Sequence, residues 1–273
     1  MIGTFITQRH EILHVITPPT PREASWIGPG SFFASVPWDI LVSTIMVVAG
    51  FFALGLGAKL LKKHAKNRSK AVLYLGLAMM TFLASMVLLV PTLFITDGLF
   101  KITDDLVARL AGLVAITLYF MFGIEIFALG GENKRTHQVF PLVFLAINLP
   151  LILLNFWHVY AVFIATGDIN LFPLLLVIQE FIATTPFLFI FLYAWRLARR
   201  VESSTEARAL KYISWSGVFM FLSYLSLAID DAIVLDNPSS LPMWLFALFG
   251  FIYFYIGVAK PRKIFTDKEI QGN

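Results

Sequence analysis

Residues 171–195 read LFPLLLVIQEFIATTPFLFIFLYAW, a stretch in which Glu180 is the single charged side chain. A helix needs about 20 predominantly apolar residues to cross the hydrocarbon core of a bilayer, where no water is available to the backbone. This stretch meets that length. It therefore predicts a transmembrane helix with an acid near its middle, because Glu180 lies about 13 Å along the helix at the usual rise per residue.

Six further stretches of similar length and hydropathy accompany it along the chain. The seven predicted spans cover residues 39–60, 71–95, 106–129, 138–157, 171–195, 209–235 and 241–259. The fourth is the least regular, because Asn148, Pro150 and Asn155 interrupt it and apolar character resumes at 159–164. The chain is 58% hydrophobic and 14% charged, with a mean hydropathy of +0.79. These values favour an all-α integral membrane protein, a seven-transmembrane helix bundle, over a soluble globule.

The distribution of lysine and arginine predicts how the bundle is oriented. Basic residues resist translocation and accumulate in cytoplasmic loops, and most of the 21 in this chain fall in alternate connections. We therefore predict an external amino-terminal segment at 1–38, the bundle at 39–259 and a cytoplasmic tail at 260–273, in the cell membrane. The residues on the predicted cytoplasmic side are Lys59, Lys62, Lys63, Lys66, Arg68, Lys70, Lys134, Arg135, Arg196, Arg199, Arg200, Arg208, Lys211, Lys260, Arg262, Lys263 and Lys268.

Two other features agree with this placement. The first 38 residues lack a basic leader and an uninterrupted apolar core, so we expect them to be retained rather than cleaved as a signal peptide. Trp38, Trp157, Trp195 and Trp244 fall at or near predicted span ends, where an amphipathic ring is expected at the headgroup level.

Ionisable side chains within the spans are the first candidates for function, because facing lipid costs them a few kcal/mol and they usually face the bundle interior. Glu180 follows Gln179 and precedes Pro186. Since proline has no amide hydrogen, it is expected to loosen the helix close to this acid. Asp230 and Asp231 lie near the outer end of the sixth span.

Arg109 lies in the third span at a depth similar to that of Asp230 and Asp231. Two interpretations are open for these residues. They form an interhelical ion pair that serves packing, or the acids belong to an outward-facing site for a small cationic or polar ligand, or for protons. Glu125, near the inner end of the third span, is either part of such a site or an acid that reaches water or a neighbouring base. The candidate residues are Glu180, Asp230, Asp231, Glu125, Arg109 and His158.

Residues 10–14 read HEILH, which has the HExxH spacing of zinc proteases. His10 and His14 are therefore alternative metal ligands. Such a site also needs a stable helix and a third ligand, whereas Pro18 and Pro19 follow the motif closely and no predicted span contains it. We therefore predict no metal site and no enzyme, with the metalloprotease kept as an alternative.

Several other chemistries lack their required residues. The seventh span has no central lysine for a retinal Schiff base, and the spans lack the paired histidines that haem needs. Cysteine is absent, so neither disulfides nor thiolate metal sites can form. Glycine patterns for nucleotides are also absent. We predict no cofactor, and no nucleic-acid partner because topology accounts for the positive charge.

The external amino terminus, the short loops and the closing stretch FIYFYIGVAKP at 251–261 resemble the seven-transmembrane sensory input region of prokaryotic signalling proteins of the histidine kinase type. The resemblance implies a sensory bundle. Because the sequence carries no kinase, cyclase or receiver domain after the last span, it also implies a separate cytoplasmic signalling partner.

These observations predict a receptor-like membrane sensor that passes its state to the basic loop between Arg196 and Lys211. One alternative is a transporter or proton relay, because acids occur at staggered depths and Pro150 and Pro186 interrupt spans. Another is a noncatalytic subunit of a larger membrane complex, in which 27 phenylalanines supply packing and lipid-facing surface.

Overall fold

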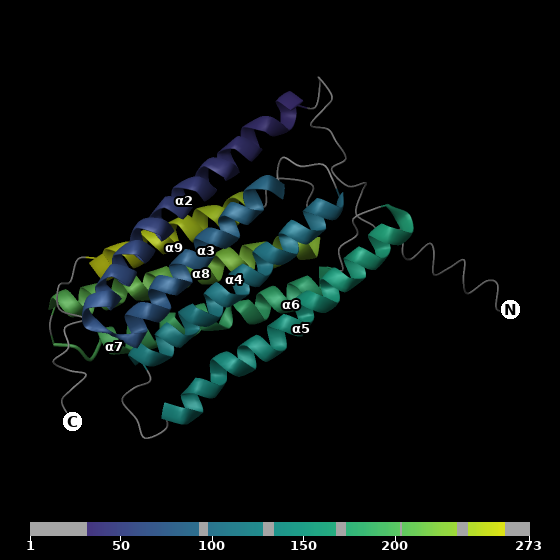
Figure 1. The fold of residues 1–273 in the computed structure, drawn as a ribbon. Helices are drawn as coiled ribbons and strands as arrows, with labels where there is room; N and C mark the ends of the chain where they lie inside the picture. Colours follow the sequence, from purple (N-terminus) through teal and green to yellow (C-terminus); the bar gives the residue numbers. More distant parts are fainter. Residues whose placement is uncertain are drawn as a thin grey trace.

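A computed structural model describes residues 32–92, 98–127, 134–167, 173–202, 204–233 and 240–259, and within these ranges the regular structure is entirely α-helical. Figure 1 shows the helices running alternately up and down one elongated bundle. They are α2 (Phe32–Asn67), α3 (Lys70–Thr92), α4 (Gly98–Phe127), α5 (Lys134–Thr166), α6 (Pro173–Ala183), α7 (Thr185–Ala198), α8 (Ser204–Ile233) and α9 (Ser240–Ala259).

The seven predicted spans are confirmed, because seven helical segments of the described chain are long and apolar enough to cross a membrane. α6 and α7 together form one of these segments, Leu174–Ala198. The architecture is therefore that of a multi-pass membrane protein. The predicted limits were too short for three helices: α2 covers Phe32–Asn67 rather than 39–60, α4 begins at Gly98 rather than at 106, and α5 covers Lys134–Thr166 rather than 138–157.

The polar residues that made the fourth span look irregular do not interrupt its helix. Asn148 and Asn155 are fully buried on the side of α5 that faces its neighbours. The Asn148 amide also donates to the carbonyl oxygen of Phe144 at 2.8 Å, one turn earlier. These residues lower the hydropathy of the stretch, but they point away from lipid, so the helix continues through Pro150.

The bundle closes on itself. α3 packs between α2 and α4, α8 packs against α9, and α9 returns to α2. α5 contacts α4 and α6 and lies at the edge of the bundle in Figure 1. Its remaining surface is apolar and exposed, as expected for a lipid-facing helix.

The fifth span is divided at Thr184, near the proline that was predicted to loosen it. The Thr184 amide donates hydrogen bonds to the carbonyl oxygens of both Glu180 and Phe181, each at 3.2 Å. The Thr184 hydroxyl donates to the same Phe181 carbonyl oxygen at 2.6 Å. Pro186 then lies in the first turn of α7, where a missing amide hydrogen costs little. As a result the two halves have different neighbours: α7 packs against α4 and α8, whereas α6 packs against α5 and α8.

Four buried rings fill the bundle at the level where α4 and α7 meet; we call them the aromatic layer. They are Tyr119, Phe122, Phe187 and Phe254, each at most 2% exposed. The Tyr119 ring centre lies 5.5 Å from that of Phe187 and 5.6 Å from that of Phe254. Ring pairs at these separations add to the stability gained from burial.

Gly217 allows α8 to approach α7 closely, which leads to a stability prediction. A Cβ at Gly217 would lie 2.9 Å from the Phe187 carbonyl oxygen and 3.0 Å from the Phe191 amide nitrogen, both backbone atoms. Gly217→Ala should therefore destabilise the protein by about 1–3 kcal/mol through overpacking. Gly55→Ala is the matched control, since a Cβ there meets nothing within 4 Å. Thermal unfolding in detergent measures both; equal unfolding temperatures would contradict the prediction.

Candidate functional site

A cavity of about 210 Å³ lies inside the bundle, lined by residues of α3, α4, α6, α8 and α9. The lining segments come from the last part of α3, the first part of α4, the last part of α8 and the first part of α9. Because successive helices run in opposite directions, all of these segments lie in the same half of the bundle, at the end where α4 and α9 begin (Figure 1).

One arginine and two carboxylates form the charged side of the cavity. The Arg109 guanidinium donates from Nη1 to Oε1 of Glu180 at 2.9 Å and from Nε to Oδ2 of Asp105 at 3.2 Å. Glu180 is only 1% exposed. A charge with so little water around it is tolerated when it is paired and hydrogen-bonded. If all three groups are ionised, they carry a net charge of −1.

The ion pair also joins two helices that otherwise diverge. Over the described residues, α4 packs against α5 and α7 rather than along α6. Arg109 on α4 and Glu180 on α6 reach each other across this gap, and Glu180 lies one turn before the break at Thr184. The break therefore opens the space beside α4, and the ion pair spans it.

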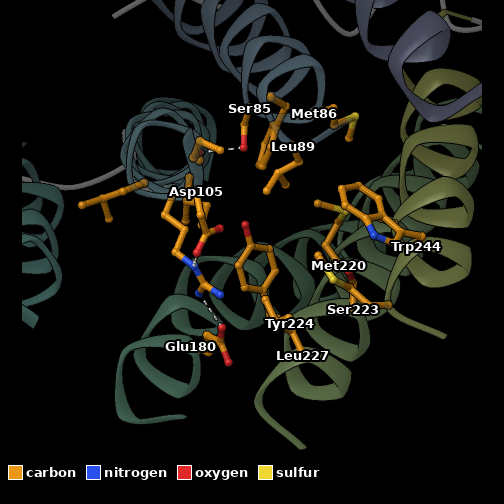
Figure 2. Close-up of a pocket in the computed structure, with 18 of the residues that line it drawn as sticks. Ser85, Met86, Leu89, Asp105, Glu180, Met220, Ser223, Tyr224, Leu227 and Trp244 are labelled. Atoms are coloured by element: carbon orange, nitrogen blue, oxygen red, sulfur yellow. Dashed lines mark hydrogen bonds and ion pairs between the residues drawn. The ribbon is translucent and has the colours of Figure 1, made fainter. Parts of the chain in front are cut away.

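Three polar side chains face the cavity without a hydrogen bond in the described structure. They are Gln179, Ser223 and Tyr224, all of which line the cavity. Gln179 is 6% exposed and Ser223 is 1% exposed. Figure 2 shows the Tyr224 hydroxyl pointing into the open space towards α3. Its ring is stacked on Phe187 with centres 5.3 Å apart. These groups can therefore bind a ligand without first breaking an internal hydrogen bond.

The opposite side of the cavity is apolar and includes Met86, Met220 and Trp244 (Figure 2). The prediction that Trp244 anchors its helix at the headgroup level was wrong, because its side chain is turned inwards and only 7% exposed. A tryptophan near a span end can face either lipid or the bundle, and the sequence does not distinguish these. Trp157, by contrast, is 73% exposed, but α5 continues past it to Thr166, so it does not mark the end of its span.

The cavity ends against the aromatic layer. Phe82 and Phe251 line the cavity on this side. Their ring centres lie 5.8 Å apart, with the ring planes at 79° to each other. Ile116 lines the cavity on α4, and Tyr119 of the aromatic layer follows one turn later along the same helix. The rings of the aromatic layer thus lie between the cavity and the end where α2 and α7 terminate.

The structure brings some of the predicted site residues together. Glu180 and Arg109 line the cavity and pair with each other. Asp230 and Asp231 belong to the last turn of α8, but their side chains lie outside the described part of the structure, so the proposed pair with Arg109 stays a prediction.

The other predicted residues lie elsewhere. Glu125 is on α4 about 24 Å from Arg109, counted along the helix, and His158 is exposed on α5; neither lines the cavity. His10 and His14 fall outside the described residues, and the described part of the chain contains no group of three or more potential metal ligands.

Sequence reasoning missed Asp105 and Trp244 as cavity residues. Asp105 was assigned to a loop, since the third span was predicted to begin at 106. The spacing of Asp105 and Arg109 was the available signal, because residues four apart on a helix face each other. No comparable signal identifies Trp244.

Comparisons with protein-family models, with curated proteins and with solved structures found no match to this chain.

The burial of Glu180 leads to a second stability prediction. Arg109→Leu removes the cation that faces a nearly fully buried carboxylate, so it should destabilise the fold by about 3–5 kcal/mol. Glu180→Gln should cost less, because the amide still accepts a hydrogen bond and Arg109 keeps Asp105. Thermal unfolding in detergent tests this order, with Glu125→Gln as the control for removing an acid elsewhere. A smaller loss for Arg109→Leu than for Glu180→Gln would refute the assignment.

Proposed function

We propose that this protein is a receptor-like sensor of the cell membrane, in which the cavity opens to the external side and binds a small ligand. The observation that carries the proposal is the cavity itself: it combines a buried ion pair, polar side chains without hydrogen bonds, and an apolar wall. Convergent polar groups in an otherwise apolar pocket are typical of small-molecule sites.

The charge distribution supports the proposed orientation. The described basic clusters lie in the last turns of α2, at the end of α7 and in the first turns of α8, with members such as Lys62, Arg199 and Arg208. These positions are at the end of the bundle opposite the cavity. Basic residues favour the cytoplasmic side, so the cavity end is assigned to the exterior and the amino terminus with it.

The aromatic layer next to the cavity favours sensing over transport. A transported solute needs a route to the second side, whereas Tyr119, Phe187 and Phe254 are packed ring to ring below the cavity. A sensor needs no such route. It needs only a ligand that binds one arrangement of the helices better than another.

The divided fifth span supplies a way to pass the bound state on. Glu180 belongs to α6, the aromatic layer includes Phe187 of α7, and α7 ends at Ala198 beside Arg196 and Arg199. A ligand that shifts Glu180 would bend the span at Thr184 and displace the end of α7. A cytoplasmic signalling protein that binds the basic loop would detect this displacement.

Transport is the second candidate, because the helix break at Thr184 lies one turn from the cavity residue Glu180. Broken helices with half-helix ends near a midplane site are a feature of many transporters. Solute flux into proteoliposomes distinguishes the two functions, since the proposed sensor should move no solute across the membrane.

Cysteine labelling tests the one-sided cavity directly, because the chain has no native cysteine to interfere. Ser223→Cys places a thiol on the cavity wall. A membrane-impermeant, positively charged thiol reagent added from the external side should modify it, since the cavity is water-accessible and bears net negative charge. Modification is measured by mass spectrometry on oriented vesicles.

Ser216→Cys is the matched control, since it lies two turns earlier on α8, is equally buried at 1% exposure and does not line the cavity. It should stay unmodified from both sides. Modification of Ser216→Cys from the cytoplasmic side would instead indicate a transporter that opens inwards. An unreactive Ser223→Cys would remove the outward-facing pocket.

A further inference from the structure

We infer that the ligand of this cavity is a small organic cation with a single positive charge and a compact apolar body. The inference rests on the proposed function and specifies the chemistry of the same site.

The balance of charge favours a cation. Asp105 and Glu180 share one guanidinium, at 3.2 Å and 2.9 Å. An added anion would have to approach two carboxylates, whereas an ammonium group would bring the net charge of the site to zero. In a site of low dielectric constant this difference is large. Arg109 keeps one positive charge in place, so a second net positive charge on the ligand would exceed what the acids can balance.

The neutral polar groups fit the same ligand. The Ser223 hydroxyl and the Gln179 amide oxygen are acceptors that are buried and carry no hydrogen bond. The Tyr224 hydroxyl, which points into the cavity in Figure 2, is a third acceptor. An ammonium group has several hydrogens to donate and no lone pair, so it can use these acceptors together with a carboxylate.

The apolar side limits the rest of the ligand. Figure 2 shows Trp244 and Met220 across the cavity from Asp105 and Glu180. An aromatic face can hold either the ligand's apolar body or, by cation–π attraction, a charge close to it. An engineered cavity of about 150 Å³ in another protein binds benzene. A cavity of about 210 Å³ therefore has room for a single ring with a short charged side chain.

Three probes of one shape and different charge test the inference: benzylammonium, benzyl alcohol and benzoate. Each is titrated at pH 7 against the full-length protein in neutral-lipid nanodiscs, with the thermal unfolding temperature as the readout. Benzylammonium should raise this temperature in a saturable way and bind at least tenfold more tightly than benzyl alcohol, and benzoate should have no effect. Tighter binding of benzoate, or no binding of benzylammonium, would overturn the inference.

Two charge-removing variants assign the effect to this site. Glu180→Gln should weaken benzylammonium binding at least tenfold and leave benzyl alcohol binding unchanged. Glu125→Gln is the control, because Glu125 does not line the cavity; it should change the binding of neither probe. If Glu180→Gln does not fold, Asp105→Asn removes the same charge at a side chain that is 28% exposed. Unchanged benzylammonium binding in the folded variant would refute the inference.

The outcomes also separate this inference from the proposed function. If benzyl alcohol binds as well as benzylammonium, and each protects Ser223→Cys from labelling, the cavity remains a ligand site but its preference for a cation is wrong. If Ser223→Cys cannot be labelled from the external side, the outward-facing pocket itself is wrong.

Discussion

The ion pair between Arg109 and Glu180 is the interaction on which the site depends. An unpaired carboxylate at this depth would be strongly disfavoured, so the position of Glu180 requires a cation from a neighbouring helix. Arg109 meets that requirement at 2.9 Å while keeping Asp105 as a second partner on its own helix. The pair joins α4 to α6 where those helices do not pack along their lengths. A cavity can persist beside it because charged hydrogen bonds, rather than apolar side chains, connect the two walls.

The break at Thr184 explains why this gap exists in one half of the bundle. A straight span would give α6 and α7 the same neighbours, and α4 would be covered along its whole length. Instead α7 stays against α4, where Gly123 admits Ile190 closely, and α6 moves towards α5. On the α7 side of the break, Phe187 packs into the aromatic layer. On the α6 side, Glu180 borders the cavity of about 210 Å³. The irregular turn at Thr184 thus lies between the aromatic layer on one side and the cavity on the other, within the same bundle of seven spans.

Hydropathy was enough to predict the seven spans, because the bilayer imposes the length of a span and requires its backbone to be hydrogen-bonded internally. The break near Pro186 followed from the chemistry of proline. The partner of Glu180 did not follow, since Arg109 is 71 residues away and relative depth alone pointed to Asp230 and Asp231. The inward turn of Trp244 was equally hidden, because it depends on the rotation of α9 about its axis. Composition thus predicts which residues form each span. The site depends in addition on how each helix is rotated about its own axis relative to its neighbours.

The same arrangement bears on how a bound ligand could change the bundle. A cation in the proposed site would compete with Arg109 for Glu180 and Asp105, so binding would alter the contact that holds α4 to α6. A ligand shifts a conformational equilibrium only by the difference in its affinity for the two states. A site built from an existing ion pair supplies such a difference, because the carboxylates must divide their hydrogen bonds between the arginine and the ligand. The apolar wall supplies affinity that does not depend on this contact, since burying the ligand's body removes apolar surface from water in either state. Sensitivity to the proposed ligand would therefore reside in the charged wall, next to the irregular turn of the fifth span at Thr184.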